Sequence, residues 1–513
     1  MIFDLKVSGE KLERQADVLI VGAGTAGLIL AVTLAEAGLR VVCLESGAEE
    51  QRGETHPLNA VHQLGEPYAG AEYGRFRCLG GSSTRWGGAL IPFQPVDLNP
   101  SIWPVQWDDL SPFLTNIERL FGFSNNSYED GTTPMGEDHV ARLAKWPRFS
   151  RRNVYTLLHR RARAAKMLEI IINATATRFG IDRGRLAEVE AQALNGGKVV
   201  VRPLHTVIAA GAIESTRILL LIDRVSNGMI TSMSSSLGCY FQDHLSAKVA
   251  TLKVSNRPKL NKLVGFRFER GGVMRNLRFE LSPQSQLRTV VPACFAHIAF
   301  SGDSSGFEAL RDLLRSMQRR ELPSSMVFVH LLRGLPWFLR AVWWRLVHQR
   351  LLYPDESRLD MHMVIDQGAH RSNQIALSDQ FKDVFGQPLA SIHWSVGERE
   401  VAAMQRATDA IEDSWRRSEI AHLAKLDLRA SEDVAIDMKS GGGIYHPTGS
   451  TRMAYNPSDG VVDRELRVFA LQDVSVCSTS VLPTGGGANP TMMLLLLTLR
   501  CAQRIKAELM PGR

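Results

Sequence analysis

The order of apolar and polar positions predicts that the chain opens with a strand, a helix and a second strand. Residues 16–23 form a β-branched apolar run that reaches a glycine, which is typical of a buried parallel strand. Residues 25–37 are rich in Ala and Leu and stop before Gly38, as a helix with a glycine C-cap does. A second apolar run follows at 40–45. Together these segments predict a β-α-β unit.

Beyond this unit the same pattern returns and then changes. Helices are expected at 153–166, 212–221 and 490–509, and strand structure at 198–209. Between about residues 245 and 429, alternating segments such as 277–281 and 361–365 suggest antiparallel strands. The predicted fold class is therefore α/β (α+β overall), a Rossmann-like domain with an inserted antiparallel-sheet domain that also contains helices.

A dinucleotide fingerprint lies between the first strand and the first helix. Gly22, Gly24 and Gly27 give the pattern G-x-G-x-x-G, which allows a tight turn, close approach to a pyrophosphate, and close helix packing. Glu45 ends the next strand, where a carboxylate can accept the hydroxyls of an adenosine ribose. The fingerprint alone leaves NAD and FAD open. The expected contacts are Gly22, Gly24, Thr25, Ala26, Gly27, Glu45 and Ser46.

A second glycine-rich segment, residues 77–88, has the sequence RCLGGSSTRWGG. Glycines let backbone amides converge on a phosphate or a flat ring, and serine hydroxyls add donors. A mobile surface loop is the alternative, which the tryptophan in its middle disfavours. The expected cofactor contacts are Gly80, Gly81, Ser82, Ser83, Trp86, Gly87 and Gly88.

This segment resembles the G-G-S-S signature of the glucose–methanol–choline oxidoreductase family, whose members bind FAD. Its form is similar to the bacterial sugar-oxidising, pyranose-oxidase-like branch, where T-H-W is common at this point. In pyranose oxidases that histidine carries a covalent flavin bond, whereas Arg85 stands here. The resemblance therefore implies FAD bound without a covalent link, with residues 74–95 as the flavin loop.

The resemblance continues along most of the chain. Similar segments occur in the family order at Trp103-Pro104 with Asp109-Leu110, at Ala209–Ser215, and at Leu237-Gly238 with Gln242-Asp243-His244. Further cofactor contacts are implied at Ala176, Ala210 and Gly211. His244 could act as a catalytic base, but a packed, hydrogen-bonded role beside Asp243 is favoured, because catalytic groups are few.

Two segments near the end of the chain resemble the H-P-x-G-T and N-P-T signatures of the family, and they imply His446 and Asn489 as the catalytic pair. A neutral imidazole can take the hydroxyl proton of an alcohol while the hydride goes to flavin N5, and an amide can hold the same hydroxyl. The alternatives are a satisfied loop histidine and a helix cap, since Asn489 and Pro490 are also expected to start the last helix. Ser480, Val481, Asn489, Pro490 and Thr491 are expected cofactor contacts.

Motif order divides the chain into two interleaved domains. Residues 1–245 and 435–513 are expected to form the FAD-binding domain, the second part carrying the catalytic pair. Residues 246–434 are expected to form the substrate-binding domain, because they carry little family signature. Length alone, 513 residues, allows roughly two to four domains.

Composition and charge exclude several classes of protein. With 44% hydrophobic and 22% charged residues, the chain is neither disordered nor fibrous. A net charge of +7 is too small to argue for nucleic acid, although an acidic substrate or a membrane surface stays open. Six scattered cysteines without a C-x-x-C pair indicate neither a metal site nor a disulfide framework. Met1–Gln15 carries charges in place of an apolar leader segment, which favours a cytoplasmic location.

One segment, Pro336–Tyr353, combines aromatic and basic residues. Arg340, Arg345 and Arg350 lie in it without an acidic residue. On a helix these arginines are about 140° apart, so no single basic face results. A peripheral membrane contact, an oligomer contact and a helix over the substrate site are the alternatives that remain.

The predicted function is FAD-dependent oxidation of an alcohol to a carbonyl compound. The branch resemblance implies a secondary hydroxyl of a sugar, glycoside or sugar-like compound as the substrate. The alternatives are the same chemistry on a non-sugar alcohol, and a dinucleotide-fold binding protein without catalysis, which His446 and Asn489 argue against. Oxygen, a quinone and a protein carrier all stay open as the electron acceptor.

Overall fold

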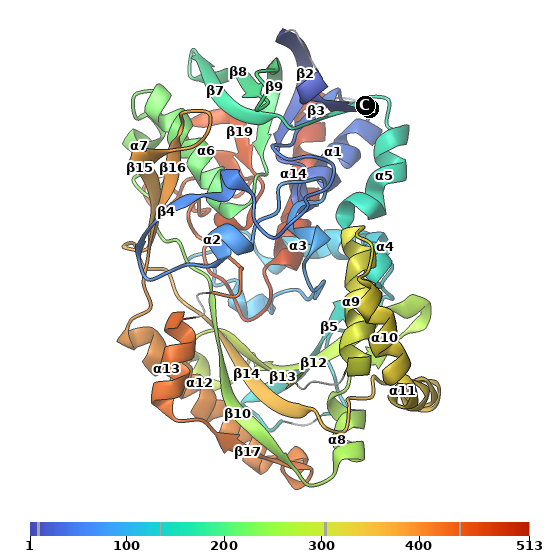
Figure 1. The fold of residues 1–513 in the computed structure, drawn as a ribbon. Helices are drawn as coiled ribbons and strands as arrows, with labels where there is room; N and C mark the ends of the chain where they lie inside the picture. The colour runs from blue at the N-terminus through green and yellow to red at the C-terminus, as the bar shows by residue number, and fades with distance from the viewer. Residues whose placement is uncertain (8–10, 134, 302–304, 441–442, 512–513) are drawn as a thin grey trace.

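Two large sheets, one mainly parallel and one antiparallel, form the upper and lower halves of the molecule in Figure 1. The structure is a computed structural model that describes residues 1–7, 11–133, 135–301, 305–440 and 443–511. The upper sheet has the order β1 (Ile2–Asp4), β6 (Leu168–Ile172), β3 (Val41–Leu44), β2 (Lys11–Val21), β9 (Lys198–Ile208), β19 (Leu471–Val476) and β18 (Arg467–Val468), and the hairpin of β7 (Thr175–Asp182) and β8 (Arg185–Gln192) joins β9. The mixed α/β class expected from the sequence is confirmed.

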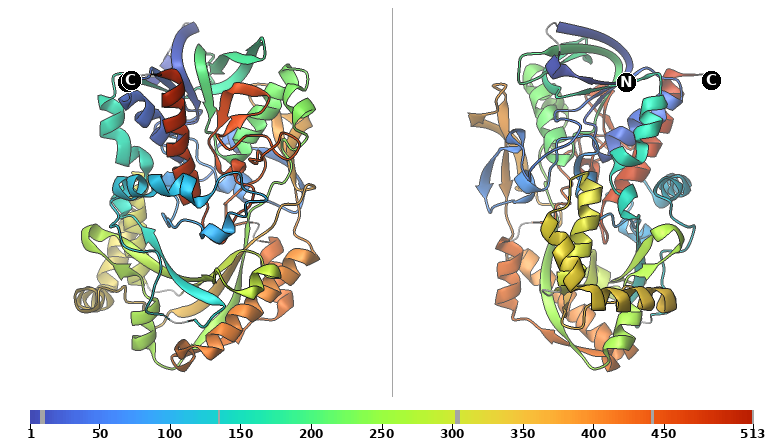
Figure 2. Two further views of the ribbon diagram at one scale, coloured as in Figure 1. Left: turned by 180° about the vertical axis from the view of Figure 1, so that it is seen from behind. Right: turned by 45° about the vertical axis from the view of Figure 1, so that its right-hand side comes forward.

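Helix α1 (Thr25–Glu36) packs against the parallel sheet, and α5 (Val154–Ala164) and α14 (Thr491–Leu509) pack on α1; Figure 2 shows α14 from behind. Helix α1 follows β2 through a tight turn that begins at Gly22, where φ is +107°. A Cβ on Gly27 would overlap the Gly22 carbonyl oxygen, so the helix can approach this closely only with glycine there. The predicted β-α-β unit is therefore confirmed.

The lower sheet has one apolar and one polar face. Its order is β11 (Arg267–Phe268), β12 (Met274–Leu281), β13 (Cys294–Ser301), β14 (Arg358–Asp366), β10 (His244–Val254) and β17 (Ala424–Leu428), and β5 (His139–Trp146) pairs with β12. Apolar side chains pack on α12 (Glu398–Arg417) and α13 (Ser431–Ser440) beneath the sheet. Because side chains alternate along a strand, the polar residues turn toward the upper half.

A third, smaller sheet packs on α6 (Ala212–Val225) of the upper half. It consists of β15 (Gln374–Lys382), β16 (Pro388–Trp394) and β4 (Val61–Gly65). A buried ion cluster anchors it, since Arg217 pairs with Glu214 at 2.8 Å and with Asp383 at 2.6 Å, and Arg77 pairs with Glu214 at 2.9 Å. Burial raises the pKa of Glu214, but the arginines outweigh it and hold that pKa at about 2. The loop that contains Arg77 and the end of β15 are thereby fixed on α6.

Helices α9 (Ser305–Arg319), α10 (Ser325–Arg333) and α11 (Leu335–His348) lie on the outside of the molecule (Figures 1 and 2). The segment 336–353 begins within α11, and Gly334 separates that helix from α10. A Cβ on Gly334 would overlap Gly306, so glycine permits this close crossing. Among the described residues, no helix combines the length and the apolar character needed to cross a bilayer. Further helices are α2 (Gly70–Tyr73), α3 (Trp107–Leu110), α4 (Leu114–Phe121), α7 (Met229–Met233) and α8 (Arg257–Val264).

Candidate active site

Segments that are far apart in the sequence meet beyond the carboxyl ends of β2 and β9. The N–H of Gly80 donates to the Ala23 carbonyl at 2.9 Å, and the N–H of Ala209 donates to the Val21 carbonyl at 2.8 Å. The two glycine-rich loops and the 209–215 turn therefore share one edge of the sheet. In open α/β sheets, ligands bind at this edge.

The predicted cofactor contacts fall in several turns along this edge. The turn between β2 and α1, with the first residues of α1, contains Gly22, Gly24, Thr25, Ala26 and Gly27, and the residues directly after β3 are Glu45 and Ser46. The second loop contains Gly80, Gly81, Ser82, Ser83, Trp86, Gly87 and Gly88. Directly before α6 lie Ala210 and Gly211, and before or at the start of α14 lie Ser480, Val481, Asn489, Pro490 and Thr491. Ala176 lies within β7, where it pairs with Ala191 of β8. Ala176 therefore lies in a hairpin strand, apart from the turns and helix starts that contain the other residues.

The start of α1 is open to a ligand. No side chain caps this helix, and a Cβ built on its N-cap residue, Gly24, would meet no atom within 4 Å. The second loop approaches from the other side, since a Cβ on Gly81 would lie 2.9 Å from the Gly24 Cα. Unpaired helix N–H groups beside two glycines fit the pyrophosphate of a dinucleotide.

Glu45 fixes the fingerprint turn as well as standing at the expected ribose position. Its carboxylate accepts from the N–H of Ala23 and from the N–H of Gly47, both at 2.9 Å. Burial raises the pKa of Glu45, while these two amides and Arg77 lower it. The residue therefore carries a structural duty that the motif alone does not reveal.

The two serines of the second loop differ in their surroundings. Ser83 is buried, and its Oγ donates to the Gly80 carbonyl at 2.6 Å and accepts from the N–H of Val154 at 3.0 Å. This hydroxyl holds the loop on α5 and is already satisfied by the protein. Ser82 is exposed, and its Oγ donates to the Gly74 carbonyl at 3.3 Å.

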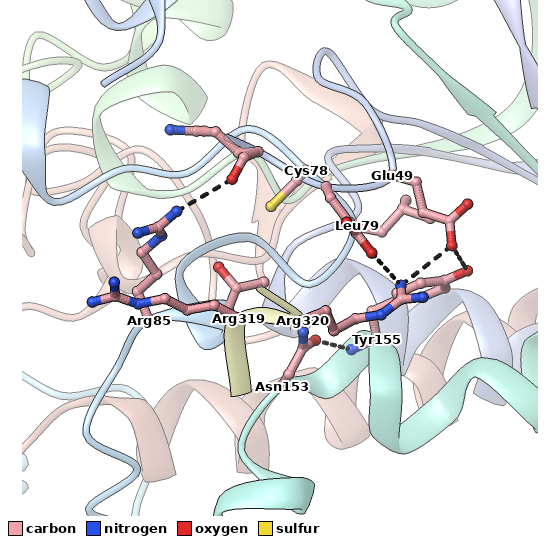
Figure 3. Close-up of a pocket in the computed structure, with 11 residues that line it drawn as sticks. Glu49, Cys78, Leu79, Arg85, Asn153, Tyr155, Arg319 and Arg320 are labelled. Atoms are coloured by element: carbon pink, nitrogen blue, oxygen red, sulfur yellow. Dashed lines mark hydrogen bonds and ion pairs between the residues drawn. The ribbon is translucent and has the colours of Figure 1, made fainter. Parts of the chain in front are cut away.

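Arg85 belongs to this loop and lines the small pocket shown in Figure 3. Its guanidinium donates to the Gln51 carbonyl at 3.2 Å and pairs with Glu321 at 3.0 Å. In the same view Arg320, which follows α9, pairs with Glu49 at 3.3 Å. The residue at the position of the family's flavin-linking histidine is therefore engaged with neighbouring loops.

A continuous chain of hydrogen bonds joins His244, His446, Asn489 and Arg278. His244 Nε2 lies 2.8 Å from the Gly486 carbonyl oxygen, which can only accept, so this nitrogen carries a proton. His244 Nδ1 lies 3.1 Å from His446 Nδ1, and His446 Nε2 lies 3.2 Å from Asn489 Nδ2. Arg278 Nη2, which can only donate, lies 2.9 Å from Asn489 Oδ1.

The two ends of this chain determine every role within it. A neutral His244 with its proton on Nε2 accepts at Nδ1, so His446 donates from Nδ1 and keeps a lone pair on Nε2. The arginine orients the amide of Asn489 so that its N–H points at that lone pair. Burial, His244 and Arg278 lower the pKa of His446 well below its ordinary value, so the ring is neutral. His446 Nε2 is thus unprotonated and can act as a base once a substrate hydroxyl replaces the Asn489 N–H at its lone pair.

One buried carboxylate fixes the backbone of both histidines. Asp243 Oδ1 accepts from the N–H of His244 at 2.6 Å and from the N–H of His446 at 2.8 Å, and Oδ2 accepts from the Tyr68 hydroxyl at 2.5 Å. A Cβ on Gly443 would overlap the same carboxylate. Burial raises the pKa of Asp243 to about 7. The structural role expected for His244 therefore holds only in part, since its ring also touches His446.

Asn489 does not cap the last helix, contrary to expectation. Helix α14 begins at Thr491, and Pro490 occupies the N-cap position. The amide side chain of Asn489 is taken by His446 and Arg278 instead. Sequence reasoning also missed Tyr68 and Arg278, because no motif marks them, and Arg278 is one of several polar residues that alternate with apolar ones along β12.

The comparisons with known proteins agree with this geometry. Residues 369–498 match the family model described as GMC oxidoreductase, and residues 17–57 match the model described as FAD binding domain. The 2-methyl-1,2-propanediol dehydrogenase of Mycolicibacterium austroafricanum is 22% identical over 96% of this chain and 95% of its own length. The C-glycoside 3-oxidase of Microbacterium trichothecenolyticum is 28% identical over 27% of this chain and 25% of its own. A formate oxidase structure from Aspergillus oryzae has a TM-score of 0.60 at 16% identity, covering 96% of this chain and 98% of its own. The chain is a GMC oxidoreductase.

The open start of α1, the two adjoining glycine loops and the buried Glu45 fit FAD in this GMC oxidoreductase. The protein is thus an FAD-dependent oxidoreductase that acts on alcohols. The model for the family spans both His446 and Asn489. These two residues come from segments that meet only in the folded protein.

Replacing Asp243 tests the dependence of the histidines on one carboxylate. Asp243→Ala leaves three buried donors without an acceptor, so we expect a loss of at least about 2 kcal/mol in unfolding free energy and a large loss of flavin reduction. Asp243→Asn keeps a carbonyl oxygen for both N–H groups and should retain most of the unfolding free energy and most of the flavin reduction. Tyr68→Phe, which removes one donor only, is the control. Equal losses in the Ala and Asn variants would contradict this role.

The same variants predict a pH dependence. Because the pKa of Asp243 is raised in the folded state, its contribution to stability is full below about pH 4 and is lost as the pH rises toward about 7. Asn cannot ionise, so the melting temperature of Asp243→Asn relative to the unmodified protein should improve over that range. Thermal melts at a series of pH values measure the difference, and a constant difference would count against the assignment.

Proposed function

We propose that this GMC oxidoreductase oxidises a secondary hydroxyl group of a sugar, glycoside or sugar-like compound to a ketone, with His446 as the base. The observation that carries the proposal is the hydrogen-bond chain that leaves the lone pair of His446 Nε2 beside the Asn489 amide. The similarity to a C-glycoside 3-oxidase supports a sugar-like substrate. A non-sugar alcohol is the second candidate, because the relative matched over its whole length is named for a propanediol.

The catalytic pair supplies two contacts to one hydroxyl group. A substrate hydroxyl that replaces the hydrogen bond between these two side chains donates to His446 Nε2 and accepts from Asn489 Nδ2. FAD, when bound, takes up the hydrogen and the electron pair that leave the carbon atom. We assign FAD binding to residues 1–245 and 435–513 and substrate binding mainly to residues 246–434, with β5 joining the substrate sheet.

His244 gives the abstracted proton a second position. When His446 has taken a proton at Nε2, its Nδ1–H faces His244 Nδ1 at 3.1 Å. Burial lowers the pKa of His244, whereas the nearby Asp366 carboxylate raises it and so favours its protonated form. Asp366 is held by the N–H of Gly485 at 3.2 Å. The pair of histidines thereby shares a charge that one buried ring would hold poorly.

His446→Ala should retain FAD and lose flavin reduction by the substrate. Removal of a general base lowers the rate by about 10²–10⁴-fold. The measurement is anaerobic bleaching of the visible flavin bands by a panel of sugars, glycosides and simple alcohols. The matched control is His393→Ala; His393 lies on β16, and its Nδ1 donates to the Ser372 carbonyl. Near-normal bleaching by His446→Ala would refute the base.

We propose that FAD is bound without a covalent link. Arg85 stands where the resemblance places a flavin-bonding histidine, and its side chain contacts the Gln51 carbonyl and Glu321. Acid precipitation should therefore release all of the yellow cofactor into the supernatant. Flavin that stays on the denatured chain would contradict the proposal.

We also propose that the protein is cytoplasmic and that α10 and α11 bind an anionic lipid surface. Large apolar side chains are exposed on both helices and the loop before them: Leu322, Met326, Phe328, Val329, Leu332, Leu335, Phe338, Leu339, Val342, Trp343, Leu346 and Val347. Residues 322–354 contain four arginines and no acidic residue. Exposed apolar and aromatic side chains with only positive charge match an interfacial helix.

Flotation with vesicles tests the lipid contact. The protein should float with vesicles that contain phosphatidylserine and much less with neutral vesicles, because both apolar burial and positive charge contribute. Leu332→Glu with Leu339→Glu should abolish flotation, whereas Leu204→Glu with Val384→Glu, two exposed apolar residues elsewhere, should not. Absence of flotation with anionic vesicles, or self-association through the same helices instead, would overturn the proposal.

A further inference from the structure

A buried arginine beside the catalytic pair has unused donors. Arg278 is only 3% exposed, and its Nη2 is bonded to Asn489. Its Nε and Nη1 have no hydrogen-bond partner among the described residues. Buried polar groups are almost always paired, so such a guanidinium indicates a partner that the protein itself does not supply.

Arg278 also lacks a direct ion pair among the described residues. In the described part of the chain, no carboxylate lies within 4.0 Å of it. Glu280, two residues farther along β12, is already held by Arg142 at 2.6 Å and by Gln94 at 3.0 Å. The guanidinium carbon lies 4.2 Å from the centroid of the Phe295 ring, which fixes the plane of the side chain. An oriented cation thus lies beside the catalytic pair without a carboxylate in direct contact.

Neighbouring polar atoms on the same sheet face are unpaired as well. His297 lies directly across from Arg278 in the register of β12 and β13. Its Nδ1 has no hydrogen-bond partner among the described residues, and neither does Glu280 Oε1. Burial lowers the pKa of His297 to about 3, so its ring is neutral. A neutral imidazole and a carboxylate oxygen can bond hydroxyl groups of a ligand that also carries a negative charge.

We propose that the substrate is a hydroxy acid whose carboxylate binds Arg278, one or two carbon atoms from the hydroxyl that His446 deprotonates. A carboxylate is the group that a buried, planar guanidinium binds best. The amide of Asn489 is all that separates the arginine from the His446 imidazole, so the two charged contacts span a short substrate. The inference rests on the proposed alcohol oxidation. Within the sugar-like compounds of that proposal, it specifies a sugar acid or a related hydroxy acid as the substrate in place of a neutral sugar.

The reaction balances with these groups. The hydroxyl proton goes to His446 Nε2, the hydrogen on the same carbon leaves with its electron pair to FAD, and a C=O bond forms, so the product is a keto acid. The carboxylate is unchanged. Since Arg278 is one of the causes that lower the pKa of His446, a bound carboxylate that offsets its charge makes the base stronger only when the substrate is present.

Matched acids and amides test the proposal without relying on turnover. In the FAD-loaded His446→Ala variant, calorimetry measures the binding of lactate, glycerate and gluconate and of lactamide, glyceramide and gluconamide. At least one acid should bind roughly 10- to 100-fold more tightly than its amide, the effect expected of a charge-assisted bond. If every acid binds as tightly as its amide and no more, the proposal is overturned, whatever substitutions of Arg278 show.

Variants of Arg278 then locate the contact. Arg278→Met should remove the preference for the acid and leave amide binding unchanged, and Arg278→Lys should keep part of it. Lys248→Met is the control: it removes a cation from the same sheet face, three strand spacings of about 4.8 Å each from Arg278. The preference for the acid over the amide should be the same with and without this substitution. If Arg278→Met weakens acid and amide alike, the arginine only positions Asn489 and the proposal fails. If Arg278→Met does not fold, the same comparison is made with Arg278→Lys at raised chloride concentration. If that variant binds the acid over the amide as strongly as the unsubstituted arginine does, the proposal is overturned.

Failure of the proposed function is a separate result. If acids bind through Arg278 but no alcohol bleaches the flavin of the unmodified enzyme, the carboxylate site stands and the alcohol oxidation falls. If neutral sugars bleach the flavin and acids show no preference, the oxidation stands and the hydroxy-acid substrate falls. The pH dependence of the bleaching rate gives a further readout. As the pH falls, the rate of the unmodified enzyme should decline at a lower pH than that of Arg278→Met, because removing the cation raises the pKa of His446.

Discussion

The geometry of this active site depends on one carboxylate that accepts two backbone N–H groups. Asp243 joins the start of β10 to the segment around His446, which lies about two hundred residues farther along the chain. Backbone hydrogen bonds between the same two segments, from the N–H of Thr448 to the Gln242 carbonyl at 2.9 Å and from the N–H of Ile444 to the His244 carbonyl at 3.2 Å, act together with this carboxylate to hold the two rings at 3.1 Å. A buried carboxylate is costly unless it is fully bonded, and the Tyr68 hydroxyl completes its set of donors.

A hydrogen-bonded chain with one-way ends gives the site its chemistry. The Gly486 carbonyl can only accept and the Arg278 guanidinium can only donate, so the tautomers between them have no freedom. An isolated neutral histidine has two tautomers, and only one leaves Nε2 basic. Burial keeps both rings uncharged, which the same chain requires. The electrostatics and the hydrogen bonding therefore select the same state of His446.

Local features of the fold could be predicted from the sequence, whereas features that depend on register could not. The β-α-β unit follows from a strand, two glycines and a helix that are adjacent in sequence, and Gly27 has a steric reason that a motif can carry. Arg278 enters the site because β12 pairs with β5 and β13 in one particular register. That register is set by the apolar face of the whole sheet, so no short motif records it. The hydroxyl of Ser83, expected to donate to the cofactor, donates instead to the Gly80 carbonyl of its own loop and accepts from the N–H of Val154 of α5.

The sheet and the outer helices break the usual burial pattern in opposite ways. On the polar face around Arg278, charged and polar groups are buried without partners, and on α10 and α11 large apolar groups are exposed to water. Each arrangement costs folding free energy, of which a domain has only about 5–15 kcal/mol in total, so neither persists for the sake of stability. One element connects the two regions: the residue before the end of α9, Gln318, donates to the carbonyls of Ser83 and Trp86 in the flavin loop. A contact made on the outer helices is therefore joined, through a rigid helix and two hydrogen bonds, to the loop that lies against the cofactor turn.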